Sequence, residues 1–204
     1  MDLRVQVAKE AARLIYTGAS EEYKQAKERA AHSLGIDVLP SNHEVAVELD
    51  ILADSIEGEA RRKLLVKMRE LALKVMMILQ EMSPILRGSV WRGTSRQGSD
   101  VDIDVYSNNP NEVEVLLAEA GYKVKGLEEA VTVHGGRTSR STHIETGLGD
   151  GIIGEVVVRP VEERDLVEKC DIYGDPKKGL DLLGLVKLMK TDPLRKFVPG
   201  RRYR

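Results

Sequence analysis

The 204-residue sequence is poor in cysteine, in aromatic residues and in long apolar runs. Its single cysteine, Cys170, excludes an intramolecular disulfide and argues against a cysteine-ligated zinc site. Aromatic residues make up only 4% of the chain, so extensive stacking on nucleic-acid bases is not expected. The first ten residues mix charges, unlike a signal peptide, and the apolar runs are too short to span a bilayer. We therefore expect a cytoplasmic protein with no membrane partner.

The overall charge is nearly balanced. The formal net charge is −2, with 31% of residues charged and 42% hydrophobic. No global attraction to nucleic acid or membrane follows from this balance, so any anion binding must come from local clusters of charge. The length is sufficient for one good core, or for one domain with a helical appendage.

The hydrophobic pattern changes character after residue 82. Apolar residues recur with a helical period over residues 1–82, and Gly18, Gly35 and Gly58 interrupt them. Four helices are therefore predicted in this part, and Pro84 ends the helical run. We expect an N-terminal helical region over these residues.

The remaining residues, 83–204, have mainly the alternation of strands. The runs typical of strands are "DVDIDVYS", "YKVKGL", "AVTVH", "THIETGL" and "GIIGEVVVRPV", and the glycines between them predict hairpins. Helices are predicted for "NNPNEVEVLLAEAG", "VEERDLVEK" and "GLDLLGLVKLMK". The expected fold is α+β, with a small mixed β-sheet flanked by helices and a basic tail.

Three aspartates alternate with apolar residues in the run "DVDIDV". On a strand, Asp100, Asp102 and Asp104 share one face and repel one another, so the row needs an explanation. Hard divalent cations supply one, because Mg²⁺ prefers oxygen ligands and is usually held by one or two carboxylates together with substrate phosphates. An acidic strand edge that discourages aggregation would account for the same residues.

A glycine-serine step precedes the aspartates. Gly88 lets the backbone approach an anion closely, and Ser89 adds a hydroxyl donor. Arg92 and Arg96 can neutralise the charge of a triphosphate. Simple turn chemistry explains the glycine but not the aspartates. Metal-binding carboxylates and a phosphate-binding loop together predict a nucleoside-triphosphate site.

The segment "GSVWRGTSRQGSDVDID" resembles the signature of the DNA polymerase beta-like nucleotidyltransferase superfamily, in which a Gly-Ser step and a basic loop precede an aspartate–apolar–acidic step. Poly(A) polymerases, CCA-adding enzymes, antibiotic nucleotidyltransferases and minimal nucleotidyltransferases carry this signature. The resemblance covers residues 87–105 and extends more loosely to residue 160. The segments "EEYKQAKERA" and "LPSNHEV" are similar to those of uncharacterised archaeal predicted nucleotidyltransferases.

The resemblance implies a nucleotidyltransferase-type catalytic domain over residues 83–204 that depends on Mg²⁺ or Mn²⁺. It implies transfer of a nucleoside monophosphate from an NTP, with ATP favoured, and release of pyrophosphate. Gly88 and Ser89 match the step that grips the triphosphate. Asp100 and Asp102 match the metal-binding pair.

The superfamily also uses a third carboxylate on a later strand, as a metal ligand or a base. Glu155 in "GIIGEVVVRP" is expected to fill that position, and Glu145 in "THIETG" is the alternative. The metal pair itself has two registers, because Asp102 with Asp104 would resemble the step in CCA-adding enzymes. The spacing from the Gly-Ser step favours Asp100 with Asp102.

The tail after Lys187 is basic and predicts contacts with the phosphates of an RNA acceptor. The cations assigned to these contacts are Arg195, Lys196, Arg201 and Arg202. A solvated chain end explains the same residues. The Gly-Arg-His stretch over residues 134–143 is interpreted as a polar connection between strands rather than a zinc site.

Three functions fit these patterns. The first is a metal-dependent nucleotidyltransferase, with RNA slightly preferred as acceptor over a protein or a small molecule. The second is a non-catalytic nucleotide- or RNA-binding module, and the third is an antitoxin-like protein whose helices bind another chain. Replacing Asp100 and Asp102 by asparagine separates them, because only the enzyme would lose transfer while keeping its fold. The oligomeric state is left open.

Overall fold

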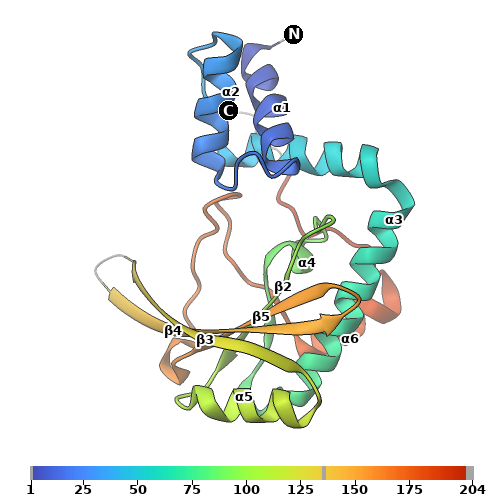
Figure 1. Ribbon diagram of the computed structural model, residues 1–204, viewed down its shortest axis with the longest axis vertical. Coiled ribbons are helices and arrows are strands. Elements are labelled where there is room, and N and C mark those ends of the chain that lie inside the picture. The colour runs from blue at the N-terminus through green and yellow to red at the C-terminus, as the bar shows by residue number, and fades with distance from the viewer. Residues whose placement is uncertain (1, 135–136, 201–204) are drawn as a thin grey trace. The chain divides into compact units, whose positions relative to one another are not determined.

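The computed structural model describes residues 2–134 and 137–200. These residues form six α-helices and a six-stranded mixed sheet, with the first helices preceding the sheet in the chain (Figure 1). The α+β class and the helical N-terminal region are therefore confirmed. Within the described ranges, no helix is long and apolar enough to cross a membrane.

The elements follow the chain in this way. The helices are α1 (Leu3–Tyr16), α2 (Tyr23–Leu34), α3 (Asn42–Ile78), α4 (Gly88–Arg92), α5 (Pro110–Glu119) and α6 (Leu182–Thr191), with 3-10 turns at Gln80–Met82 and Val161–Glu163. The strands are β1 (Ile85–Leu86), β2 (Val101–Tyr106), β3 (Lys123–His134), β4 (Arg137–Gly149), β5 (Ile152–Arg159) and β6 (Leu180–Asp181).

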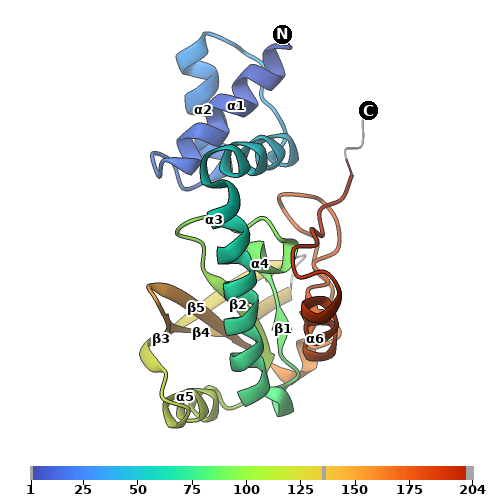
Figure 2. The same ribbon diagram turned by 90° about the vertical axis from the view of Figure 1, so that its right-hand side faces the viewer.

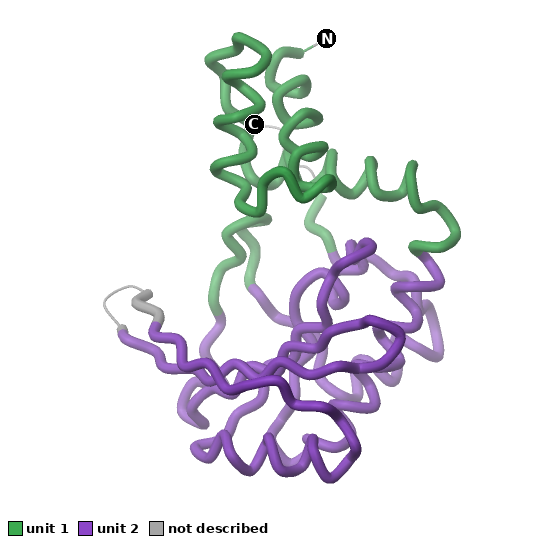
Figure 3. Tube along the Cα trace, in the orientation of Figure 1, with its two compact units in different colours: residues 1–61, 168–176, 198–204 green, residues 62–167, 177–197 purple. Residues whose placement is uncertain are grey.

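The chain divides into two compact units (Figure 3). Unit 1 holds residues 1–61 and 168–176 with the chain end from residue 198, and unit 2 holds residues 62–167 and 177–197. The sequence pattern predicted a division after residue 82 instead. The difference arises because the second half of α3, although helical like the residues before it, packs into the core of the sheet.

Helix α3 is interrupted at Gly58, as the sequence predicted. Gly58 has φ of 52° and ψ of −125°, which is not a helical conformation. The first half of α3 packs with α1 and α2 in the core of unit 1. That core is built largely from small residues, including Ala8, Ala11, Ala12, Ala26, Ala30 and Ala31. Small side chains let helices approach one another closely.

The sheet of unit 2 has the strand order β3-β4-β5-β2-β1-β6. Only β2 and β5 pair in parallel, and the other neighbours pair antiparallel. Of the hairpins expected between the glycine-separated runs, β3–β4 and β4–β5 are present, whereas the runs "YKVKGL" and "AVTVH" form one strand, β3. In the parallel pair, Asp102 lies opposite Glu155. The strand with the aspartates therefore lies inside the sheet rather than at its edge.

Helices cover one face of this sheet (Figure 2). Val101, Ile103 and Val105 of β2 are almost completely buried in the same core as side chains from α3, α5 and α6. Because side chains alternate along a strand, the aspartates of β2 point to the opposite face. The apolar half of the alternating pattern thus forms the core, and the acidic half is presented away from it.

One predicted helix is wrong. The run "VEERDLVEK" forms only the 3-10 turn Val161–Glu163 and irregular chain after it. Its apolar residues Leu166 and Val167 are exposed. A short helix with no apolar face packed against a core is only marginally stable, which explains the outcome.

Replacing Ile103 by alanine tests the position of β2 in the core. Ile103 is 1% exposed, so the cavity left by Ile103→Ala is expected to lower the free energy of unfolding by about 2–5 kcal/mol. Val115→Ala on α5 removes an apolar side chain that is 52% exposed and should change it by about 0.5 kcal/mol or less. Urea unfolding monitored by circular dichroism measures both, and equal effects would contradict this packing.

Candidate functional site

Carboxylates from three strands form one row across the face opposite the helices. Asp102 on β2 lies opposite Glu155 on β5, and Glu155 lies opposite Glu145 on β4. Neighbouring strands are about 4.8 Å apart, so this register brings the three backbones into immediate proximity. Both residues predicted as the third carboxylate thus share the row of Asp102.

Asp104 differs from Asp100 and Asp102, because it is neutralised by arginines. It is 6% exposed. Its Oδ2 accepts hydrogen bonds from Arg87 Nε at 2.9 Å and from Arg159 Nε at 3.1 Å. Arg87 also donates to the Tyr106 hydroxyl at 3.2 Å and to the Lys177 carbonyl. Asp104 is therefore a structural ion-pair centre, which leaves Asp100 with Asp102 as the pair that a metal could use.

The side-chain carboxylates of Asp100 and Asp102 have neither a hydrogen-bond donor nor a cationic partner among the described residues. Burial raises the pKa of Asp102 to about 7, with further increases from the negative charges of Glu155, Asp100 and Asp104. Burial also raises the pKa of Asp100, and the charges of Glu155 and Glu145 add to the effect. The site therefore has a deficit of positive charge at neutral pH.

Glu155 makes a contact that the sequence did not predict. Its Oε1 lies 2.7 Å from Nδ1 of His143, and Nε2 of His143 lies 3.1 Å from the Ser141 hydroxyl. The sequence interpretation put His143 in a polar connection, whereas the structure places it within β4. The alternation of "STHIET" contained the signal, because Ser141, His143 and Glu145 must share one strand face.

Glu145, the alternative third carboxylate, is more exposed and is held by a lysine. Its Oε1 accepts a hydrogen bond from Lys125 Nζ at 2.7 Å, and its side chain is 50% exposed. Glu155 is 41% exposed in its side chain and lies one strand nearer to Asp102. The geometry therefore favours Glu155 as the partner of the aspartates.

Gly88 lies directly against the carboxylate of Asp102. A Cβ atom built on Gly88 would be 1.7 Å from Asp102 Oδ2, and the φ of Gly88 is +60°. A side chain at this position would be strained by the backbone conformation and would force the Asp102 carboxylate to move. Gly88 begins the short helix α4, and Ser89 follows it with a half-buried side chain. The Gly-Ser step and the aspartate row, predicted to form one site, are therefore in direct contact.

The two arginines predicted to contact a triphosphate occupy different environments. Arg92 is 4% exposed, donates from Nη1 to the Phe197 carbonyl at 3.0 Å, and stacks on the ring of Trp91. This places Arg92 in the protein interior rather than at an open anion site. Arg96 is half-buried in the turn that precedes Asp100, where its backbone N–H donates to Ser99 Oγ at 3.0 Å. Arg96 is thus the better placed of the two for an anion.

The basic tail is described only in part. Arg195 and Lys196 are exposed, and the guanidinium of Arg195 lies 5.2 Å from the ring centre of Phe197. Arg201 and Arg202, the other two cations assigned to an RNA acceptor, lie outside the described residues.

The chemistry of the site suits a hard divalent cation. Over residues 2–134 and 137–200, no group of three or more His, Cys, Asp or Glu side chains is already arranged around a common metal position. Glu155 and Glu145 are turned to His143 and Lys125. Two carboxylates, Asp100 and Asp102, remain, and that number is typical of Mg²⁺ bound jointly by protein and phosphates. A cation would also offset the burial and the electrostatic repulsion that together raise the pKa of Asp102.

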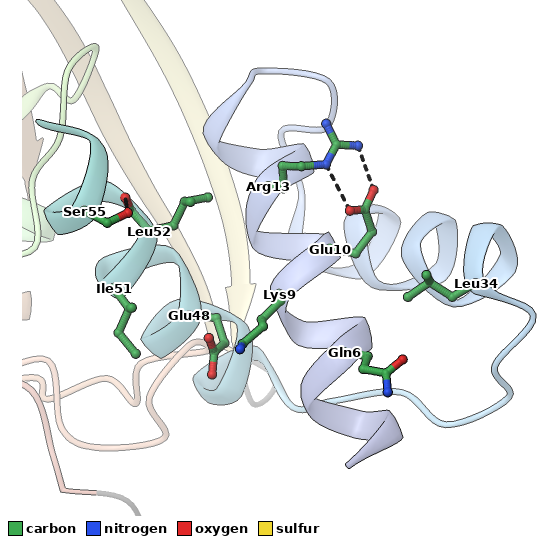
Figure 4. Close-up of a pocket in the computed structure, with 9 residues that line it drawn as sticks. All are labelled: Gln6, Lys9, Glu10, Arg13, Leu34, Glu48, Ile51, Leu52 and Ser55. Carbon is green, nitrogen blue, oxygen red and sulfur yellow. Dashed lines mark hydrogen bonds and ion pairs between the residues drawn. The ribbon is translucent and has the colours of Figure 1, made fainter. Parts of the chain in front are cut away.

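A groove of about 460 Å³ lies elsewhere, within unit 1 (Figure 4). Its walls come from α1, the end of α2 and the first half of α3. Leu34, Ile51 and Leu52 contribute apolar surface, and Arg13 is paired with Glu10 at 2.7 Å. None of the residues predicted for the nucleotide site lines this groove.

Comparisons of the chain with models of protein families, with curated proteins and with solved structures found no match. The case for this site therefore depends on its own residues and geometry.

Replacing Gly88 by alanine tests the contact with Asp102. Gly88→Ala is expected to lower the free energy of unfolding by about 3–5 kcal/mol, from the left-handed backbone and from the overlap with the carboxylate. Gly35→Ala is a matched control, since Gly35 has φ of +65° and nothing within 4 Å of its Cβ position. It should lose only about 1–2 kcal/mol. Equal losses in urea unfolding would show that the close approach does not exist.

The raised pKa of Asp102 predicts a dependence of stability on pH. An unfolded aspartate titrates near pH 4 and the folded one at about 7, so between these values the folded protein holds the extra proton and loses stability as the pH rises. In EDTA at pH 8, Asp102→Asn should therefore raise the free energy of unfolding by about 2–4 kcal/mol, and by much less at pH 4.5. The exposed Asp165→Asn variant is the control. A gain for Asp102→Asn that is equal at both pH values would refute the assignment.

Proposed function

We propose that the chain is a metal-dependent nucleotidyltransferase that transfers a nucleoside monophosphate from an NTP to an acceptor hydroxyl. The observation that carries the proposal is the contact between Gly88 and Asp102, in which a carboxylate that has no cationic partner among residues 2–134 and 137–200 lies against the glycine of a Gly-Ser step. The resemblance of residues 87–105 to the polymerase beta-like signature supports the same conclusion from the sequence.

One set of residues is assigned to the metal ion and another to the triphosphate. Asp100 and Asp102, completed by Glu155, would hold Mg²⁺ or Mn²⁺. The backbone of Gly88, the hydroxyl of Ser89 and the guanidinium of Arg96 would bind the triphosphate of the NTP, with ATP the favoured donor. When bound, the ion would neutralise charge on the carboxylates and phosphates.

The reaction is an in-line displacement at the α-phosphorus. The acceptor hydroxyl forms a new P–O bond, the bond to the β-phosphate oxygen breaks, and pyrophosphate leaves. The proton of the hydroxyl passes to Glu155 or to solvent. Most of the rate gain would come from holding the reacting groups in line and from neutralising charge.

RNA is the acceptor that we favour, in a cytoplasmic reaction. Arg195 and Lys196 are exposed, and Lys196 passes close to the end of α4, with its Cα 3.2 Å from a Cβ built on Gly93. Cations at this position can contact the phosphates of a strand whose 3′ end enters the site. Aromatic residues are few, so recognition would depend mainly on the backbone of the acceptor.

A transfer assay tests the proposal. The protein is incubated with Mg²⁺ or Mn²⁺ and each α-labelled NTP, together with total RNA, with protein extract or with neither. We expect label in one acceptor pool, and a loss of at least about 100-fold in Asp100→Asn and Asp102→Asn, because each removes charge that positions the phosphates. Circular dichroism of each variant shows whether the fold persists.

The exposed Asp165→Asn variant controls for the substitution and should transfer at the wild-type rate. Tight NTP binding without transfer to any pool would support a non-catalytic binding module. If the protein shows no NTP binding and no transfer, the site is refuted. A stable complex with another protein that survives Asp102→Asn would point to an interaction protein.

A further inference from the structure

Arg69 is a completely buried arginine that donates hydrogen bonds to four backbone carbonyls. It lies on the second half of α3 and is 0% exposed. Its Nε donates to the Val90 carbonyl at 3.0 Å, and its Nη2 donates to the carbonyls of Trp91 at 2.9 Å and Arg195 at 3.0 Å. Its Nη1 donates to the Pro193 carbonyl at 2.6 Å. One side chain therefore ties the end of α4 to a segment far along the chain.

That segment, residues 193–197, is called the C-terminal strap here. It is bonded to α4 a second time, because the Phe197 N–H donates to the Arg92 carbonyl at 2.8 Å and Arg92 Nη1 donates to the Phe197 carbonyl at 3.0 Å. Gly93 allows the close approach, since its φ is +75° and a Cβ there would be 2.8 Å from the Arg195 carbonyl oxygen. The strap is thus fitted to the end of α4 without room for a side chain between them.

An ordinary packing role does not account for the choice of arginine. Burial lowers the pKa of Arg69 to about 10, and the negative charge of Asp192 opposes this shift. An apolar side chain could fill the space, but it would leave four carbonyls without this donor. What arginine adds is a planar fork of donors, which fixes the directions of several carbonyls at once.

Helix α4 has only five residues, so it has no stability of its own and its position is set by its ends. At its start, the Arg87 N–H donates to the Asp102 carbonyl at 2.8 Å and the Arg87 side chain binds Asp104. At its other end lie Arg69 and the strap. The position of Gly88, which contacts Asp102, and of Ser89 next to it is therefore set by contacts at both ends of α4.

We propose that Arg69 is a positioning residue for the nucleotide site, and that it acts by clamping the C-terminal strap onto α4 so that Gly88 and Ser89 keep their place against Asp102. The inference rests on the proposed function, because the strap would support Gly88 and Ser89, the residues proposed to bind the triphosphate. It adds a part of the site that lies outside residues 87–105 and that carries no catalytic group.

The test compares Arg69→Met with Arg61→Met. Arg61 is a matched control, since it is also on α3 and 4% exposed, but in unit 1, where it pairs with Asp50 and Asp54. Binding of each NTP in the presence of Mg²⁺ is measured by calorimetry without acceptor, and KM and kcat are measured with it. We expect Arg69→Met to raise the Kd and the KM for the NTP by about 10–100-fold, because small displacements at a binding loop have effects of this size. Arg61→Met should leave both values at the wild-type level.

Two further measurements separate positioning from stability. Hydrogen exchange should be faster at the Phe197 N–H in Arg69→Met and unchanged in Arg61→Met. Arg69→Lys should not restore NTP binding, because one ammonium cannot reach four carbonyls. If Arg69→Met does not fold, Gly93→Ala displaces the strap instead, and Gly121→Ala, with φ of +86° and nothing within 4 Å, is its control.

The outcomes distinguish this inference from the proposed function. If the wild-type protein binds none of the four NTPs, both are overturned. If it binds an NTP and Arg69→Met binds as tightly while its strap exchanges faster, only the positioning role is overturned. Equal weakening in Arg69→Met and Arg61→Met would also overturn it, since the effect would then follow stability alone.

Discussion

Repulsion among carboxylates on one face of the sheet is the constraint around which unit 2 is organised. Three members of the group have a basic partner: Asp104 binds two arginines, Glu145 a lysine and Glu155 a histidine. The Asp102 carboxylate has no such partner among the described residues, and burial, together with the neighbouring negative charges, raises its pKa to about 7. The Asp102 carboxylate lies against Gly88, where a side chain would overlap it. Keeping this buried carboxylate lowers the stability of the folded protein. Sites that bind charged ligands carry such costs, because the ligand removes them.

The position of the short helix α4 is fixed by the residues around it. Five helical residues cannot hold a geometry alone, so arginines at both ends determine where the Gly-Ser step lies. One of them, Arg87, is adjacent in sequence to α4, whereas the other, Arg69, comes from the helix under the sheet. Both use several donors at once, which fixes direction as well as distance. We therefore expect α4, with Gly88 at its start and Gly93 after its end, to be more rigid than these glycines would indicate.

Local patterns predicted much of this structure. The break at Gly58, the strand of alternating aspartates and both hairpins follow from periodicity and turn chemistry, which neighbouring residues determine. The Gly-Ser step and the aspartates were expected to form one site, but the direct contact of Gly88 with the Asp102 carboxylate was not predicted. Long-range contacts were not predictable: Arg69 reads as a charged residue on a helix surface, and the boundary at residue 61 depends on which core α3 enters. The helix wrongly expected over "VEERDLVEK" had local propensity without a core to pack on.

The bonds that Arg69 makes to the strap join residues 124 and 126 positions apart in the chain. The β4–β5 hairpin, by contrast, joins strands that are adjacent in the chain. Contacts between residues far apart in the sequence form late in folding, because a large loop must close before they can be made. The position of the Gly-Ser step would therefore be fixed later in folding than the hairpin that carries Glu145 and Glu155.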